Sequence, residues 1–266
     1  MKCVLISGSS GGMGLATVKK LIENGYFVFG VDIKETEYHN ENFRFIKTDI
    51  RDIKSIESAY EEVRKITDEI DAIINMSGIY DLNSLIEISE EDFIKIFDIN
   101  VFGAYRLNKV FSSMLVDKGK IIITSSELAP LYPLPFTGIY AITKKTIEGY
   151  ADSLRMELQL LDKYVSVIRP GAVDTTLLDV STEKVKEFTN TTTHYQYNSE
   201  RFKRIVDKVE SRKVSPEKIA NLALKILKKK KPKYVYKINR NPLLLIFNIL
   251  LKRMQNHIIK RILMKK

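Results

Sequence analysis

Short apolar runs alternate with longer segments of helical periodicity through roughly the first 170 residues of this chain. Such runs are typical of strands buried on both faces, and helices between them imply that neighbouring strands are parallel. Right-handed crossovers then predict an α/β fold, a Rossmann-type doubly wound parallel sheet with helices on both faces. The runs that we expect to be strands cover residues 3–6, 27–31, 43–46, 72–74, 121–124 and 165–168.

Helical patterns fill the gaps, for example over 53–66 and 93–115. Ser215 and Pro216 are typical of the start of a helix, which we expect to precede a seventh strand at 234–236.

Residues 176–213 differ from the rest because they are polar, and we expect a substrate loop or lid there. The sequence thus predicts one domain over residues 1–240, followed by a basic segment, 241–266.

The net charge of +10 is concentrated at the end of the chain. Residues 225–266 hold 14 Lys and Arg and no Asp or Glu, which leaves 29 basic and 33 acidic residues in 1–224. The main domain is therefore mildly acidic, and the overall charge gives no reason to expect a nucleic-acid partner.

Few residues suit covalent cross-links, metals or membrane spans. Cys3 is the only cysteine, and the three histidines are far apart in the sequence. This excludes a disulfide framework and gives no metal-ligand spacing. The longest apolar stretch, 243–251, is nine residues, whereas a membrane-spanning helix needs about 20. With no secretory signal pattern at the start, we expect a cytoplasmic protein.

A glycine-rich turn lies between the first expected strand and a helix over 15–23. Glycines let the backbone approach a pyrophosphate closely, and the helix N-terminus supplies free N–H groups and partial positive charge. The alternative is a tight turn without a ligand, but the strand before it and the helix after it favour dinucleotide binding. The turn residues expected to bind the cofactor are Gly8, Ser10, Gly12, Met13 and Gly14.

Asp32 ends the second expected strand, 18 residues after Gly14. A carboxylate there can accept hydrogen bonds from the ribose hydroxyls and would repel a 2′-phosphate, which favours NAD. Lys34 is close enough to leave NADP as the alternative cofactor. Asp32 could also be an ordinary solvated residue at a strand end.

At this point the chain resembles the short-chain dehydrogenase/reductase family over residues 1 to about 240. The matching motifs occur in the same order as in the family. They are Gly8, Gly12 and Gly14 in TGxxxGxG with Ser7 for Thr, Asp49 after the third strand, Asn75-Met76-Ser77-Gly78 for NNAG, Asn100, Ser125-Ser126, Tyr140 and Lys144 in YxxxK, and the loop 170–175.

The resemblance implies a cofactor site and a catalytic set. Tyr140 would be the acid/base, Lys144 would lower its pKa and bind ribose, Ser126 would polarise the substrate oxygen, and Asn100 would hold a water that links Lys144 to solvent. The further cofactor contacts that it implies are Asp49, Ile50, Asn75, Ser77, Gly78, Tyr140, Lys144, Pro170, Gly171, Val173 and Thr175.

One departure concerns the serine. Ser126 and Tyr140 are 14 positions apart, one more than in the family pattern, which indicates an insertion within 127–138. Either Ser125 or Ser126 could therefore be catalytic, and we choose Ser126.

The chemistry requires a tyrosine that can exchange a proton near neutral pH. Free tyrosine has a pKa of about 10, so lowering it by about 3 units needs about 4 kcal/mol of preferential stabilisation of the phenolate. Lys144 shares a helix face with Tyr140 at i+4 and can supply part of it, whereas Lys145 should be solvated. We expect an NAD(P)-dependent oxidoreductase that interconverts a secondary alcohol and a ketone.

A different class of function uses the same fold without catalysis, as an NAD sensor or a membrane-surface scaffold. Such a protein has no reason to keep Ser126, Tyr140, Lys144 and Asn100 together, so the four residues favour the enzyme.

The substrate is expected to be apolar, because residues 128–136 carry three prolines and mostly apolar side chains. Tyr80, Leu82, Leu177 and Leu178 would lie around the same cleft. The alternative is that all of these residues pack the lid.

The basic tail is predicted to form one amphipathic helix. Such a helix can dock on its own domain or on a second subunit, as in a homodimer or homotetramer, or it can lie on an anionic membrane. The apolar stripe of that helix comprises Leu243, Phe247, Leu250, Leu251, Met254, Ile258 and Ile262.

Overall fold

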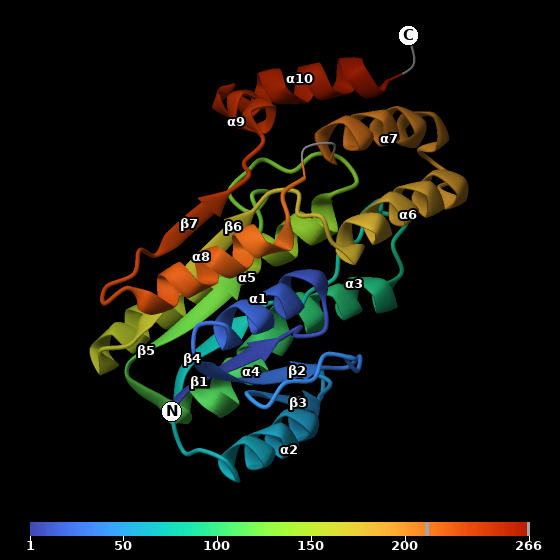
Figure 1. Cartoon of the computed structure of the whole chain (residues 1–266). Helices are drawn as coiled ribbons and strands as arrows, with labels where there is room; N and C mark the ends of the chain where they lie inside the picture. The colour runs from blue at the N-terminus through green and yellow to red at the C-terminus, as the bar shows by residue number, and fades with distance from the viewer. Residues whose placement is uncertain (211–212, 265–266) are drawn as a thin grey trace.

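The computed structural model describes residues 1–210 and 213–264, with the side chains of all but 176–182 and 207–210. Within these residues seven parallel strands form one sheet in the order β3-β2-β1-β4-β5-β6-β7 (Figure 1). The order reverses between β1 and β4, where doubly wound sheets bind ligands. The predicted fold is confirmed. The strands are β1 (Lys2–Ser7), β2 (Tyr26–Asp32), β3 (Phe43–Lys47), β4 (Ile70–Asn75), β5 (Leu115–Thr124), β6 (Tyr164–Pro170) and β7 (Val235–Ile238).

Helices cover both faces of the sheet, and each face has its own core. Leu5 of β1 points into one core, and its neighbours Val4 and Ile6 point into the other. This double burial is why the strands read as continuous apolar runs. Two helices, α1 (Gly12–Ile22) and α8 (Pro216–Lys228), cover one face, and α2 (Ile53–Arg64), α4 (Gly103–Phe111) and α5 (Gly138–Leu158) cover the other.

The long helix expected over 93–115 is divided into pieces. An α-helix, α3 (Glu90–Phe97), passes through one π-helical turn, η1 (Asp98–Phe102), into α4, and the 3-10 turn η2 (Ser112–Met114) follows. Wider turns of this kind are frequent at functional sites. Asn100 lies within this one.

Residues 176–191 and 196–210 of the expected loop or lid are helical, so an irregular loop is the wrong description of them. Helices α6 (Thr176–Thr191) and α7 (Gln196–Glu210) form a hairpin beside the end of the sheet (Figure 1). Val185 and Phe188 of α6 and Phe202 and Val206 of α7 pack together. Helical spacing of these apolar residues supplies a stable structure despite the polar composition.

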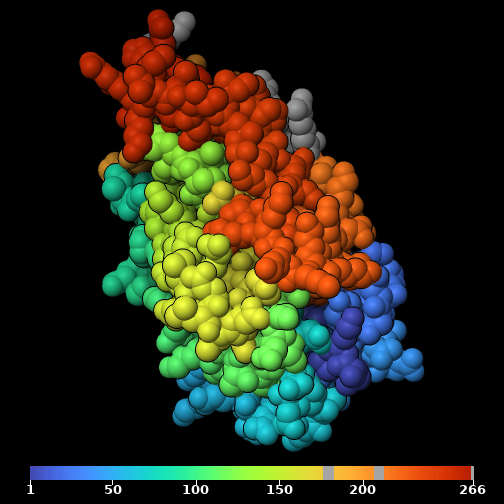
Figure 2. Space-filling model, turned by 90° about the vertical axis from the view of Figure 1, so that its left-hand side faces the viewer, coloured from blue at the N-terminus to red at the C-terminus, as the bar shows by residue number. Residues whose placement is uncertain are grey.

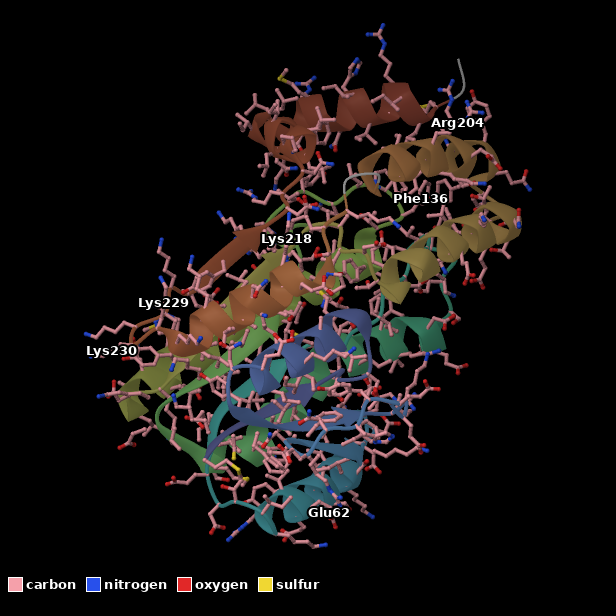
Figure 3. All side chains as sticks on the ribbon, viewed as in Figure 1. Glu62, Phe136, Arg204, Lys218, Lys229 and Lys230 are labelled. Atoms are coloured by element: carbon pink, nitrogen blue, oxygen red, sulfur yellow. The ribbon has the colours of Figure 1, made fainter. Side chains whose placement is uncertain are left out.

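Phe136 is the centre of this lid core and enters it from the segment before α5 (Figure 3). Its ring centroid lies 4.7 Å from that of Phe188, 5.2 Å from that of Tyr195 and 5.4 Å from that of Phe202. Its backbone has φ 66°, in the left-handed region that side chains other than glycine rarely adopt. The aromatic packing offsets the cost of that conformation.

Glu87 holds the turn between the two lid helices. Its carboxylate accepts hydrogen bonds from the Thr192 hydroxyl at 2.7 Å and from the backbone N–H groups of Thr193 at 2.8 Å and His194 at 3.0 Å. Although partial burial acts to raise the pKa of Glu87, these hydrogen bonds lower it to about 2. The ionised carboxylate therefore ties the lid to the loop after β4.

The basic tail forms two helices, α9 (Pro242–Ile249) and α10 (Lys252–Leu263), so the prediction of one helix is wrong. The backbone is extended at Leu250, with ψ 150°, and the Gln255 side chain donates a hydrogen bond to the Leu250 carbonyl at 2.7 Å. This bond satisfies a carbonyl group that the broken helix leaves free.

The tail docks on its own domain, which was one of the alternatives. The side chains of Asn198 and Arg201 in α7 donate hydrogen bonds to the carbonyls of Leu263 and Ile262 at the end of α10. The predicted stripe is not the buried face, because the break at Leu250 changes the phase of the helix. Leu244, Gln255 and Leu263 are buried instead.

The tail forms the outer layer at one end of the molecule (Figure 2), and much of its apolar surface is open to solvent. The basic residues of the C-terminal part lie in two places, since Lys229 and Lys230 are at the end remote from α10 (Figure 3). No helix in the described part of the chain is both long and apolar enough to cross a bilayer. The exposed apolar residues include Leu243, Ile246, Ile249, Leu251, Met254 and Ile262.

Candidate active site

The glycine turn brings three backbone segments into close contact. A Cβ atom at Gly14 would lie 1.9 Å from the Gly8 carbonyl oxygen, and one at Gly12 would lie 2.7 Å from Cγ2 of Thr175. Gly8 itself has φ +70°. Because α1 begins at Gly12, its first N–H groups have no partner within the helix and face the turn. Only glycines allow this cradle, and it fits a pyrophosphate.

Asp32 is fixed beside the turn. Its carboxylate accepts hydrogen bonds from the backbone N–H groups of Ser10 at 3.1 Å and Lys34 at 3.0 Å. The Ser10 hydroxyl in turn donates to the Lys34 carbonyl at 2.7 Å. Each carboxylate oxygen keeps a further lone-pair position with which it could accept a ribose hydroxyl.

A groove runs from this turn along the carboxyl edge of the sheet, and most of the expected cofactor residues line it. Asp49 forms a two-pronged ion pair with Arg51, whose Nη2 lies 2.7 Å from Oδ2. Hydrogen bonds from Arg51 lower the pKa of the Asp49 carboxyl. Sequence reasoning missed Arg51, although it lies only two positions after the acidic motif residue. The expected residues on the groove are Gly8, Ser10, Gly12, Met13, Gly14, Asp32, Asp49, Ile50, Ser77, Gly78 and Thr175.

Asn75 is an exception among them. Its side-chain amide donates to Oδ1 of Asn108 in α4 at 2.9 Å, within the buried layer behind β4, and it does not line the groove. Both side chains are buried, and a buried polar group needs a hydrogen-bond partner, so the Asn75 amide pairs with Asn108. The other residues of the expected cofactor set, Pro170, Gly171, Val173, Tyr140 and Lys144, line the adjoining cavity.

Tyr140 and Lys144 lie one turn apart on α5, and Ser126 follows β5. The side chains of Ser126 and Tyr140 are hydrogen-bonded to each other. The Lys144 ammonium lies 5.6 Å from the centroid of the Tyr140 ring and donates to the Thr124 carbonyl at 3.3 Å. All three side chains are buried. The structure thus brings the predicted serine, tyrosine and lysine together.

Burial sets the proton affinities of this cluster. It raises the pKa of Tyr140 to about 12, against the opposing hydrogen bond from Ser126. It lowers the pKa of Lys144 to about 8, although the carboxylate of Glu148 acts in the other direction. In the chain without a cofactor, desolvation therefore outweighs any lowering of the Tyr140 pKa by the Lys144 ammonium.

The two candidate serines have different partners. The Ser125 hydroxyl donates to the backbone carbonyl of Lys144 at 3.3 Å, whereas Ser126 contacts the phenol. Geometry therefore favours Ser126. Lys145, the next residue along α5, is exposed as expected.

Asn100 joins the π-helical turn to the loop after β4. Its Oδ1 accepts the N–H of Ile79 at 2.8 Å, and its Nδ2 donates to the Ile79 carbonyl at 2.9 Å and to the Thr143 hydroxyl at 3.1 Å. A Cβ atom at Gly78 would lie 3.2 Å from Asn100 Oδ1 and 3.4 Å from Lys144 Nζ. Because Gly78 has no side chain, Asn100 Oδ1 and Lys144 Nζ can both lie close to its Cα atom.

A second, mostly apolar cavity adjoins the groove at the cluster. Tyr80 lines both, and its ring packs on that of Tyr140 at 4.6 Å between centroids. Of the expected substrate residues, Leu82 is buried in the lid core, and the side chains of Leu177 and Leu178 lie outside the described residues. Thr175, the residue at which both spaces meet, occupies the N-cap position of α6 without a capping hydrogen bond from its side chain.

Several cavity residues had not been foreseen. They come from the lid helix α7, from α9 and from the position after Ser126. Nothing in the sequence indicated which faces of α7 and α9 would point toward the site. The lining residues that the sequence did not suggest include Phe202, Ile205, Val206, Leu244 and Glu127.

Residues 2–186 match the family model described as short chain dehydrogenase. The chain belongs to the short-chain dehydrogenase family. Oxidoreductases of this family act on CH–OH and ketone groups and bind NAD(P), so this protein is an NAD(P)-binding oxidoreductase of that kind.

Named relatives include reductases. A 3-ketodihydrosphingosine reductase of Bacteroides thetaiotaomicron is 27% identical over 88% of this chain and 87% of its own length. An NADPH-dependent 1-acyldihydroxyacetone phosphate reductase of Schizosaccharomyces pombe is 30% identical over 65% of this chain and 60% of its own.

Solved structures share the fold. A short chain dehydrogenase family protein from Francisella tularensis superposes with a TM-score of 0.74 at 23% identity, over 90% of this chain and 97% of its own. A 3-ketoacyl-(acyl-carrier-protein) reductase from Brucella melitensis complexed with NADH gives 0.73 at 18% identity, over 89% and 96%.

Proposed function

We propose that this protein interconverts a secondary alcohol and a ketone by hydride transfer, with Tyr140 as acid/base. The observation that carries the proposal is the buried contact of Ser126, Tyr140 and Lys144 at the junction of a dinucleotide groove and an apolar cavity. Bound NAD(P) supplies or accepts the hydride.

The residues of the chain divide the remaining work. Ser126 donates a hydrogen bond to the substrate oxygen, which stabilises the charge that develops there. The Tyr140 hydroxyl delivers a proton to that oxygen or removes one from it. Lys144 lies where it can hold the ribose and stabilise the phenolate, and Asn100 holds a water that connects Lys144 to solvent.

The cofactor is NAD. The Asp32 carboxylate stands beside the turn, where it would accept ribose hydroxyls and repel a 2′-phosphate. Both cofactors occur among the named relatives and neighbours, so this choice rests on Asp32 itself.

The substrate is a ketone with an apolar body. Leu128, Leu134, Phe202 and Leu244 line the cavity, and such walls favour an alkyl chain over a charged sugar. The relative named as a 3-ketodihydrosphingosine reductase supports a ketone as the reacting group.

The test compares the wild type with Tyr140→Phe in a screen of alcohols and ketones with NAD(H) and NADP(H). Turnover is monitored by the absorbance of the reduced nicotinamide. We expect turnover by the wild type and a loss of about 10²- to 10⁴-fold in the variant, with NADH binding retained. Undiminished turnover in the variant would refute the acid/base assignment. A wild type that binds NADH but turns over no alcohol or ketone would favour the sensor.

We further propose that the solvent-exposed face of the tail, opposite to its contact with the domain, binds an anionic membrane surface. Ile246, Ile249 and Leu251 are 62%, 83% and 73% exposed, and α10, which begins at Lys252 directly after Leu251, carries the basic residues Lys252, Arg253, Lys260 and Arg261. No acidic residue occurs after Glu217. Apolar side chains flanked by lysines and arginines fit an interface with acidic headgroups, whereas a second copy would place like charges together.

Liposome co-sedimentation of the full chain tests this surface. The protein should sediment with phosphatidylserine-containing vesicles, less with neutral ones, and Ile249→Glu/Leu251→Glu should abolish it. Leu160→Glu, at a site 82% exposed elsewhere, is the matched control. Equal sedimentation of both variants would contradict the proposal, and a dimer or tetramer broken by the tail variant would assign the surface to subunit contact.

A further inference from the structure

Glu127 places a carboxylate in the wall of the substrate cavity, directly after Ser126. The residue is 8% exposed, and its backbone N–H donates to the Pro170 carbonyl at 2.8 Å. One carboxylate oxygen, Oε2, accepts the backbone N–H of Asn241 at 2.7 Å. Glu127 thus lies between the catalytic serine and the start of the tail.

The other oxygen, Oε1, lies against Gly171, where an added Cβ atom would approach it to 2.9 Å. Among the residues that the structure describes, no hydrogen bond to Oε1 and no ion pair of Glu127 occurs. Burial raises the pKa of the Glu127 carboxyl, opposed by the Asn241 hydrogen bond and the charge of Arg240. A buried carboxylate with one free oxygen is costly unless a ligand completes it.

The Glu127 carboxylate lies in a cavity whose wall carries few charged side chains. Of the described residues on the cavity wall, Glu127 is the only carboxylate, and Lys144 is the only ammonium. Anchoring Asn241 does not require a charge, because a glutamine would accept the same N–H at a smaller desolvation cost. The carboxylate therefore leaves Oε1 available to a group inside the cavity.

We propose that Glu127 is a specificity-determining residue that binds a primary ammonium group, so that the preferred substrates are amino ketones with the amine close to the carbonyl. This inference rests on the proposed function. Ser126 and Glu127 are consecutive and line the same cavity, so one substrate can reach the first with its carbonyl oxygen and the second with a nearby ammonium.

The experiment compares three long-chain ketones of equal length: the plain ketone, the same ketone with an α-amino group, and its N-acetylated form. We expect wild type to prefer the α-amino ketone to the N-acetylated one by at least about tenfold in kcat/KM, the value of a charge-assisted hydrogen bond. Glu127→Gln should bring that ratio close to one. Glu87→Gln should keep it, because Glu87 also anchors a distant segment but lies outside the cavity.

A ratio unchanged by Glu127→Gln, or equal losses on all three ketones, would overturn the inference. Calorimetric binding of dodecylamine separates it from the proposed reaction. If no ketone is reduced but the wild type binds the amine at least tenfold more tightly than Glu127→Gln, the reaction fails and the cation site stands. Equal binding of the amine by both proteins overturns the cation site.

Discussion

Replacing Lys144 by methionine removes a positive charge from beside the phenol and keeps much of the side-chain volume. The ammonium lies 5.6 Å from the centroid of the Tyr140 ring. At an effective dielectric constant of about 20, one charge at that distance stabilises a phenolate by about 3 kcal/mol. This corresponds to about two pH units in the pKa of the phenol, or about 100-fold in the population of phenolate.

The assay is the pH profile of kcat for NAD⁺-dependent alcohol oxidation, measured at saturating cofactor so that weaker ribose binding does not enter. In the proposed reaction the Tyr140 phenolate is the base, so the rate should rise with pH through the pKa of Tyr140. Without the ammonium that pKa increases. The profile of Lys144→Met should therefore move up by about two pH units, with a loss of about 100-fold at any pH well below the wild-type midpoint and a much smaller one above it.

The control is Lys145→Met, which removes an equal charge from the exposed side of the same helix and should leave the profile in place. A Lys144→Met profile that falls by one factor at every pH, with its midpoint unmoved, would refute the electrostatic argument. The lysine would then act only by positioning the cofactor.

Three further substitutions probe the groove and the lid. Asp32→Ala should raise the Kd of NAD about 10- to 100-fold by calorimetry and that of NADP much less, and equal losses would mean that Asp32 does not read the ribose. Gly14→Ala puts a methyl group 1.9 Å from the Gly8 oxygen, so NADH binding should vanish and the free energy of unfolding should fall by about 1–3 kcal/mol. The control is Gly149→Ala, which has no neighbour within 4 Å and should not lower the Tm. Glu87→Gln should lower the free energy of unfolding in urea more at pH 7 than at pH 3. The folded-state pKa of Glu87 is depressed to about 2, so its carboxylate contributes stability that is fully present above the unfolded pKa of about 4.5. That contribution is lost as the pH falls toward 2. A pH-independent loss would show that the charge of Glu87 is not involved.

The sheet and the cofactor groove could be predicted because they depend on local signals. Each strand is short and apolar on both faces, and the glycines of the turn are required by backbone contacts within a few residues of one another. The same holds for Tyr140 and Lys144, whose spacing on one helix fixes their proximity.

The lid and the tail depend on contacts across long sequence separations. Nothing in the sequence marks Leu250 as a break, since neither glycine nor proline lies there, and the helix ends where Asn248 accepts the N–H of Tyr132 and Gln255 caps Leu250. The hydrogen bond of Asn75 could not be foreseen for a similar reason, because its partner Asn108 is 33 residues away. Glu127 was read as part of an insertion, and its role depends on Asn241.

The left-handed backbone of Phe136 links the lid to catalysis mechanically. Its ring is held by α6 and α7, and its main chain lies four residues before Tyr140. Parting the two lid helices would free the ring and let this residue relax to an ordinary conformation, which would reorient the first turn of α5. The conformation of Phe136 therefore couples the packing of α6 and α7 to the orientation of the helix that carries Tyr140.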